Sequence, residues 1–297
     1  MISVTDPIGA AFERTSQILF RPFSGKKWLA LAFCCFLASL LSGGGSGGGS
    51  GGGNGWDEDG SGFVHDVRHN LEIVLIIAGV ALLFGLGFLL LFTWIQSRGK
   101  FMFLDGLARN RGAVAEPWKE QRQLGNNLFF FTFWLTLGFA TVSLLVLGAG
   151  FAVAWPDIES EVFEDAAVAG LLVGLGLLFV FGLLYTIVCF LLEQFIVPAM
   201  YIHNATVGEA WRLVRAEIIA NNGGTIFLFF LMKVLFGVAS VVIMIAFTCM
   251  TCCVTALPYV GTVLLLPLFV FNRCYTLAFI EQFGENWRFF EADQAEV

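Results

Sequence analysis

Charged side chains are scarce in this chain of 297 residues, at 13% of the total, whereas soluble domains carry about 25%. This scarcity excludes an ordinary water-soluble fold, because 58% of the residues are hydrophobic and a fold of this size could not bury them all. The mean hydropathy of +0.81 and the 33 phenylalanines indicate the same class of protein. We therefore expect the lipid bilayer to be the main partner of the chain.

Catalytic motifs are missing as well. The sequence has no H-E-x-x-H motif and no paired acids on a soluble scaffold. Its basic residues are spread along the margins of apolar segments, where anionic lipid headgroups are their natural counterions. We therefore expect a protein that is not an enzyme, holds no cofactor and binds no nucleic acid.

Long apolar runs dominate what the sequence does contain. A crossing of about 30 Å of hydrocarbon takes roughly 20 helical residues, and other backbone conformations leave polar groups unpaired there. The last run, Thr225 to Ile280, would be about 84 Å long as one helix, so Pro258 and Gly261 predict a turn within it. We predict an all-α integral membrane protein, a single domain over 1–297 formed by a bundle of six transmembrane helices. The predicted spans are 28–42, 71–95, 128–155, 166–192, 225–247 and 257–280.

The distribution of positive charge predicts how these spans are oriented. All but two of the 16 lysines and arginines fall on one side, while acids crowd the opposite loops at 57–66 and 157–165. The positive-inside rule places this basic side in the cytoplasm, with both termini, and we expect location in the cell inner membrane. The basic-side residues are Arg14, Arg21, Lys26, Lys27, Arg98, Lys100, Arg109, Arg111, Lys119, Arg122, Arg212, Arg215, Arg273 and Arg288.

The segments between the spans have two characters. Residues 43–62 are rich in glycine and serine, which predicts a flexible outer loop. The cytoplasmic segments are amphipathic, which predicts interfacial helices lying on the membrane. The first begins at Asp6 and Pro7. Its predicted apolar stripe is Ile8, Ala11, Phe12, Thr15 and Leu19.

A weak internal repetition runs through the chain. Units of cytoplasmic segment, outward helix, outer loop and returning helix start near residues 5, 100 and 194. Glu193-Gln194-Phe195 after the fourth span recurs as Glu281-Gln282-Phe283 after the sixth. Three repeated helical hairpins are one interpretation, and chance similarity among phenylalanine-rich helix ends is the other.

One basic residue, Lys233, lies well inside a predicted span. A buried ammonium needs a partner or a route to water, and ionisable groups within membranes often mark substrate or proton pathways. The cytoplasmic ends of the fourth and sixth spans hold Glu193, Arg273 and Glu281, which predicts an intramembrane polar cluster of these four residues. The alternative is that Lys233 snorkels to the lipid phosphates or forms a structural ion pair.

Cysteine and histidine patterns occur on the predicted outer side. Cys249, Cys252 and Cys253 end the fifth span, where an oxidising compartment would permit a disulfide among them. His65 and His69 flank Asp66 at a spacing that suits a divalent ion, but a third fixed ligand is missing, so we predict no metal site. The alternative for the cysteines is simple apolar packing.

Small residues form a close-approach face in the fourth predicted span. Gly170 and Gly174 are four residues apart, so another helix can approach their shared face closely. Packing within the chain is the first interpretation. A homodimer, or contact with another membrane protein, is the second.

Short aromatic motifs give the chain a family resemblance. With them it resembles uncharacterised six-span bacterial inner-membrane proteins, related to the membrane domain attached to some glycerophosphodiester phosphodiesterases. The resemblance implies a location and a topology but no activity, since no residue matches the metal-binding acids and histidines of the soluble phosphodiesterase barrel. The motifs are Asp6-Pro7-Ile8, Ile18-Leu19-Phe20-Arg21-Pro22-Phe23, Lys27-Trp28-Leu29, Phe103-Leu104-Asp105, Pro117-Trp118 and Pro198-Ala199-Met200-Tyr201.

Two functional hypotheses follow from these patterns. The first is a non-enzymatic multi-pass membrane protein that acts in membrane organisation, lipid contact or partner binding. The second is a small transporter or channel that uses the cluster around Lys233. Access of water to Lys233 distinguishes them.

Overall fold

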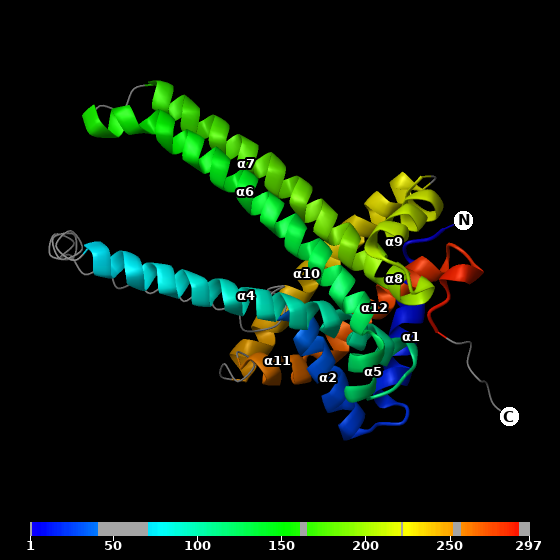
Figure 1. The fold of residues 1–297 in the computed structure, drawn as a ribbon. Coiled ribbons are helices and arrows are strands. Elements are labelled where there is room, and N and C mark those ends of the chain that lie inside the picture. The colour runs from blue at the N-terminus through cyan, green and yellow to red at the C-terminus, as the bar shows by residue number, and fades with distance from the viewer. Residues whose placement is uncertain (1, 41–70, 161–164, 221, 252–256, 291–297) are drawn as a thin grey trace.

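The computed structural model describes residues 2–40, 71–160, 165–220, 222–251 and 257–290, and every regular element in these ranges is a helix (Figure 1). The long helices are α4 (Leu71–Ala108), α6 (Arg122–Ser160), α7 (Asp165–Leu191) and α10 (Gly223–Met250). The shorter α-helices are α1 (Asp6–Phe20), α2 (Gly25–Ser39), α5 (Ala115–Glu120), α8 (Val197–His203), α9 (Val207–Leu213), α11 (Pro258–Leu264) and α12 (Leu266–Glu281). Two π-helices, η1 (Leu192–Ile196) and η2 (Val214–Ile219), and a 3-10 helix, η4 (Glu285–Trp287), complete the set.

Within the described ranges, four helical stretches are long and apolar enough to cross a membrane. They support the prediction of an all-α membrane protein. Their lengths differ from the predicted spans because α4 and α6 continue as helices into polar segments, and because α7 continues through η1 into α8. The stretches are Gly79–Ala108, Arg122–Ala152, Leu172–His203 and Gly223–Met250.

The first and last predicted spans are shorter or broken. Helix α2 has 15 residues, or about 22 Å, which is less than the hydrocarbon thickness. The last span is divided at Leu265 into α11, with 7 residues, and α12, with 16. Pro267 lies in the first turn of α12, where its missing N–H is tolerated but where it cannot continue a helix from α11. The count of six spans thus stays a prediction.

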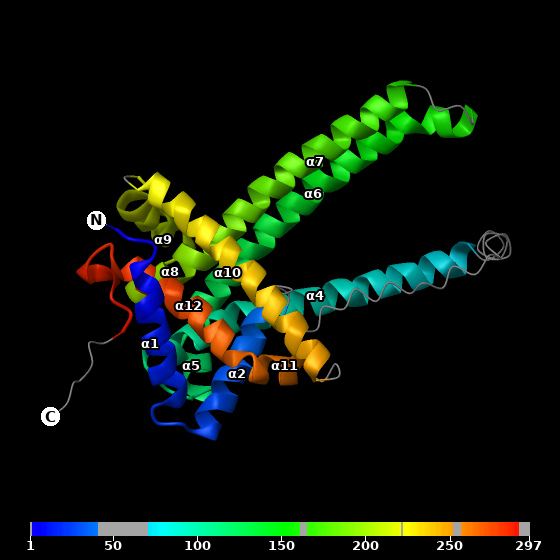
Figure 2. The ribbon, with the colours of Figure 1, turned by 180° about the vertical axis from the view of Figure 1, so that it is seen from behind.

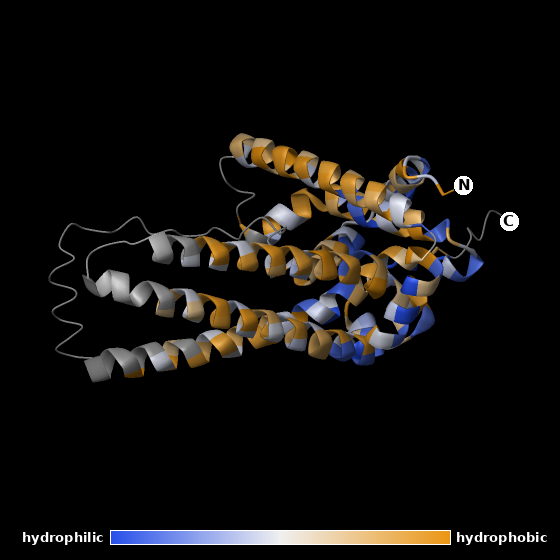
Figure 3. Cartoon of the chain, turned by 90° about the horizontal axis from the view of Figure 1, so that it is seen from above, coloured by the Kyte–Doolittle hydropathy of each residue, from blue (hydrophilic) through white to orange (hydrophobic). Residues whose placement is uncertain are grey.

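The long helices come together at one end of the molecule, where α1, α5, α8 and α12 also lie (Figures 1 and 2). We call this polar end the base. Hydrophilic residues gather at this end, near both termini, while the outer parts of the long helices are apolar (Figure 3). The buried core lies in the base as well, around Phe101, Leu104, Phe195 and Tyr275. No residue of the most apolar stretch of Arg122–Ala152 is buried. The outer helices thus present their apolar surface to the lipid.

The predicted interfacial helix α1 packs on α12. Ala11, Thr15 and Leu19 of the predicted stripe are buried in the structure, while Phe12 is 71% exposed. Ser3 exchanges two hydrogen bonds of 2.8 Å with the side chain of Gln282, through its backbone N–H and carbonyl. Most of the predicted stripe therefore packs against the rest of the protein, and Phe12 stays exposed.

Helix pairs differ in where they touch. Helices α6 and α7 contact each other along their length, through Thr136 and Tyr185 and farther out where Gly150 and Gly174 line a shared groove. A Cβ added at Gly150 or Gly174 would meet no atom within 4 Å, so α6 and α7 do not approach closely at these glycines and both interpretations of the small-residue face stay open. Helices α4 and α6 instead meet at the base, where Asn126 accepts hydrogen bonds from Trp94 and Arg98, and then diverge (Figure 1).

Close approach of α2 to α4 depends on a glycine. A Cβ added at Gly99 would lie 2.7 Å from backbone atoms of Leu37 and Ala38. We expect Gly99→Ala to lower the free energy of unfolding by about 1–3 kcal/mol, because one of the two helices must move away. Equilibrium unfolding in detergent measures this.

Gly87→Ala is the matched control on the same helix. A Cβ at Gly87 meets no atom within 4 Å, and alanine is a better helix former than glycine. Its stability should stay equal or rise. Equal destabilisation by the two variants would contradict the close approach at Gly99.

Candidate functional site

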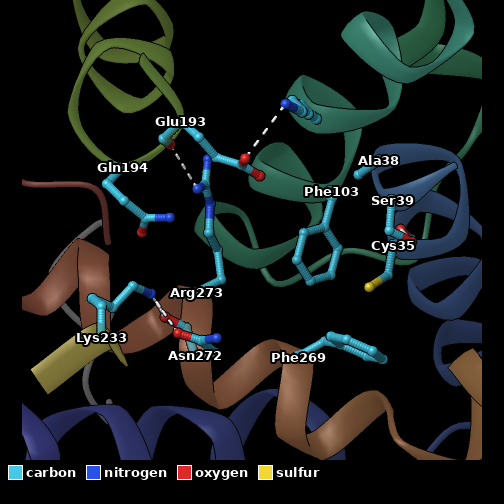
Figure 4. Close-up of a pocket in the computed structure, with 11 residues that line it drawn as sticks. Cys35, Ala38, Ser39, Phe103, Glu193, Gln194, Lys233, Phe269, Asn272 and Arg273 are labelled. Atoms are coloured by element: carbon cyan, nitrogen blue, oxygen red, sulfur yellow. Dashed lines mark hydrogen bonds and ion pairs between the residues drawn. The ribbon is translucent and has the colours of Figure 1, made fainter. Parts of the chain in front are cut away.

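A cavity of about 290 Å³ lies between α2, α4, η1, α10 and α12 in the base (Figure 4). Three of the four residues of the predicted cluster, Glu193, Lys233 and Arg273, line it. The remaining lining residues are Cys35, Ala38, Ser39, Lys100, Phe103, Gln194, Phe269 and Asn272. We refer to this space as the Lys233 cavity.

The π-helix η1 presents two of the polar groups. Pro198 has no N–H to donate to residue 194, and the Val197 N–H reaches back five residues to the Leu192 carbonyl. The wider turn that results carries Glu193 and Gln194 at the edge of the cavity. Single π-turns within α-helices are frequent at functional sites.

Lys233 is held by neutral oxygens. Its ammonium donates hydrogen bonds to the Asn272 side-chain oxygen, to the Asn272 carbonyl at 3.1 Å and to the Thr276 hydroxyl at 3.0 Å. These three bonds use all three N–H groups of the ammonium. Lys233 is thus fixed in place, and among the described residues no carboxylate is in direct contact with its ammonium.

Arg273 and Glu193 connect α12 to the π-turn. Arg273 Nη1 donates a hydrogen bond of 2.9 Å to the backbone carbonyl of Glu193. The Glu193 carboxylate instead lies 3.6 Å from the Lys100 ammonium of α4. The cluster therefore joins α4, α7 with its π-turn, and α12.

The walls of the cavity differ in polarity. In Figure 4, Glu193, Gln194, Arg273, Asn272 and Lys233 come together on one side. Phe103, Phe269, Cys35 and Ala38 face them from α4, α12 and α2. The arrangement fits a ligand with one polar and one apolar part better than a fully hydrated ion.

The fourth predicted member, Glu281, lies in another network. Its carboxylate accepts hydrogen bonds from the backbone N–H groups of Phe289 at 3.1 Å and Phe290 at 3.2 Å, and it lies 3.8 Å from Arg14. The chain after α12 folds back and supplies these partners. Glu281 therefore secures the chain end and does not line the Lys233 cavity.

A buried carboxylate that the sequence did not single out organises the rest of the base. Asp105 is fully buried and accepts hydrogen bonds of 2.9 Å from Arg111 Nε and from the Tyr201 hydroxyl, with Arg109 at 3.3 Å. The hydrogen bond to Asp105 raises the pKa of the Arg111 guanidinium. Asp105 thus ties α4 to α8 and to the turn before α5. It belongs to Phe103-Leu104-Asp105, one of the motifs behind the family resemblance, and this motif therefore has a structural role.

The predicted metal and disulfide patterns lie largely outside the described residues. His65, Asp66, His69, Cys252 and Cys253 fall in ranges that the structure does not describe, so both predictions stay open. Cys249 lies in the last turn of α10 and is exposed. Among the described residues, no group of three or more His, Cys, Asp and Glu side chains is placed to hold a metal ion.

Loss of the Asp105 carboxylate should be costly. Asp105→Asn leaves Arg111 without its closest counter-charge, and we expect a loss of about 3 kcal/mol in the free energy of unfolding. Glu116→Gln is the matched control, because Glu116 also bonds Arg111, at 3.0 Å, but its side chain is 65% exposed. The control should lose less than about 1 kcal/mol. Equal effects in detergent unfolding would contradict a central role for Asp105.

Comparison with known proteins places the chain in a family. A family of unknown function, DUF7544, matches residues 2–284. No curated protein and no solved structure matches the chain. The suggested relation to the membrane domain of glycerophosphodiester phosphodiesterases stays a prediction. Because the match runs from before α1 to beyond α12, the protein belongs to the DUF7544 family.

Proposed function

We propose that the protein is a non-enzymatic multi-pass membrane protein that contacts lipids with its outer helices and holds a polar site in its base. One observation carries this proposal. The four long helices bury at most 6% of their most apolar stretches, yet they leave a base that is packed, charged and internally hydrogen-bonded. A large exposed apolar surface beside a folded polar end fits a protein whose solvent is the bilayer.

Six crossings are supported by the positions of the first and last helices in the structure. Helices α1 and α12 lie together in the base, as does α2 with the base end of α4 (Figures 1 and 2). Helix α4 begins at its outer end and α10 finishes at its own, which favours one crossing before α4 and another after α10. On this basis α2 belongs to the first crossing, and α11 with α12 forms the last. Threefold repetition of hairpins is part of the same proposal.

The orientation follows from charge. Basic residues of the base include Arg98, Arg111 and Arg122, and Lys233 lines the cavity there, whereas residues 71–97 of α4 and 123–160 of α6 contain no lysine or arginine. The positive-inside rule then favours a cytoplasmic base and location in the cell inner membrane. Arg98 lies 4.1 Å from the ring of Trp94 and 5.0 Å from that of Trp118, as befits residues at a membrane boundary.

A second candidate function is a small transporter or channel. The specific observation in its favour is that Lys233 is half-buried and lines a cavity between helices. Polar side chains of five elements meet there, as at substrate sites of transport proteins.

Labelling of single cysteines from outside the cell tests the topology. In a cysteine-free background, Ser160→Cys and Leu257→Cys should react with a membrane-impermeant maleimide, because both lie at the outer side. Ser24→Cys, Lys119→Cys, Gly208→Cys and Glu285→Cys should react only after the membrane is opened. With only four crossings, Ser24→Cys and Glu285→Cys would react from outside while Lys119→Cys would not.

The same labelling experiment, with a single cysteine at position 233, separates the two candidate functions. A transporter must expose its site alternately to both sides, so Lys233→Cys should react from outside as well as from the base. The lipid-contact function requires reaction from the base side alone or none at all. Reaction from outside would therefore move transport to the first place.

A further inference from the structure

We propose that the Lys233 cavity binds the phosphate group of an anionic ligand, and this inference rests on the proposed function. It names the chemistry of the polar site, whichever way the helices cross the membrane. The same phosphate chemistry can come from a phospholipid headgroup or from a small soluble phosphate.

The charges around the cavity are not balanced. Lys100, Lys233 and Arg273 line it, and Glu193 is the one acid among the described lining residues. This leaves a formal excess of two positive charges in a partly open cavity, in which the Lys100 side chain is only 18% exposed. Unpaired charges away from bulk water are costly, so a negatively charged group in the cavity would be favoured.

Donors for such a group remain after the internal bonds are made. Arg273 uses one N–H on the Glu193 carbonyl and has the rest of its guanidinium fork, while Lys100 makes its ion pair with Glu193 at 3.6 Å, beyond hydrogen-bond distance. Lys233 is saturated by Asn272 and Thr276 and contributes charge alone. A guanidinium fork beside an ammonium is the usual donor set for phosphate oxygens.

The depth of the cavity suits a headgroup. Trp94 and Trp118 make an edge-to-face contact at a ring distance of 5.8 Å, and tryptophans gather at the membrane–water boundary. Lys100 lies six residues beyond Trp94 on α4, which is about 9 Å toward the base. On the proposed topology, Lys100 therefore lies on the headgroup side of the hydrocarbon region. The apolar wall of Phe103 and Phe269 could then cover the first carbons of the attached chains.

The size of the cavity limits what enters. A volume of about 290 Å³ is at the small end of ligand sites and accepts a headgroup or a small phosphate ester, but not a whole lipid. The positive excess disfavours cations and zwitterions with an exposed ammonium. An anionic glycerophospholipid with its chains outside the cavity meets all these conditions.

Binding to the purified full-length protein in a neutral detergent tests the inference without reference to topology. The probes are phosphatidylglycerol, diacylglycerol with the same acyl chains, and inorganic phosphate with chloride at equal ionic strength. The variants are Lys100→Gln and Arg273→Gln, with Lys119→Gln as an exposed basic control outside the cavity. If Arg273→Gln does not fold, Lys100→Gln still decides the outcome.

We expect phosphatidylglycerol to bind at least tenfold more tightly than diacylglycerol, and Lys100→Gln, but not Lys119→Gln, to remove most of that difference. This result supports a lipid source. Binding of inorganic phosphate without a preference for phosphatidylglycerol over diacylglycerol, if it is lost in Lys100→Gln, supports a soluble source. Absence of any phosphate preference, or equal loss in Lys119→Gln, would overturn the inference. Reaction of Ser24→Cys and Glu285→Cys from outside in the labelling experiment would instead refute the six-span topology, and the inference of phosphate binding would still hold.

Discussion

Apolar side chains gain no hydrophobic free energy when they leave lipid for a helix interface, because the acyl chains are equally apolar. Packing and polar contacts must hold a membrane protein together instead, and in this chain both are concentrated at one end. The outer parts of α4 and α6 share no hydrogen bond among their described residues, while at the base Asn126 bonds both Trp94 and Arg98. The arrangement of the helices therefore depends on the base.

Within the base, two networks divide the structural work. Asp105 fixes the turns of the base through Arg111 and Tyr201, and neither of these partners lines the Lys233 cavity. The π-turn before Pro198 brings Glu193 to Arg273 and Lys100 and so opens a polar space between helices. In the first network, the two arginines that contact Asp105, Arg109 and Arg111, also have glutamate partners, so their charges are balanced. The second has an excess of positive charge, which is why it, and not the first, is suited to a ligand.

The sequence predicted the class of fold and much of the cavity, for identifiable reasons. A lysine inside an apolar run is conspicuous, so Lys233 could be found, and Glu193 and Arg273 follow from their places near the ends of predicted spans. Asn272, which holds the ammonium, is a neutral residue with no such signal. Lys100 was one base among many at a span end. Pro198 inside a helical pattern was the available sign of the π-turn.

What failed or stayed open depended on distant parts of the chain. Glu281 occupies a place like that of Glu193, but the returning segment supplies the N–H groups of Phe289 and Phe290, and no local pattern predicts that return. The buried state of Asp105 depends on Tyr201, far along the sequence. Helix α2 is shorter than an ordinary crossing, so apolar length alone could not determine the number of spans.

Distances between spin labels test most directly whether the base holds the helices while their outer parts diverge. Labels at Leu83 of α4 and Leu172 of α7, both exposed, report on the outer region, and labels at Lys119 and Gly208 report on the base. In nanodiscs we expect a narrow distance distribution for the base pair and a long, broad one for the outer pair. A short and narrow outer distance would mean that the helices pack together across the membrane, and it would contradict this account.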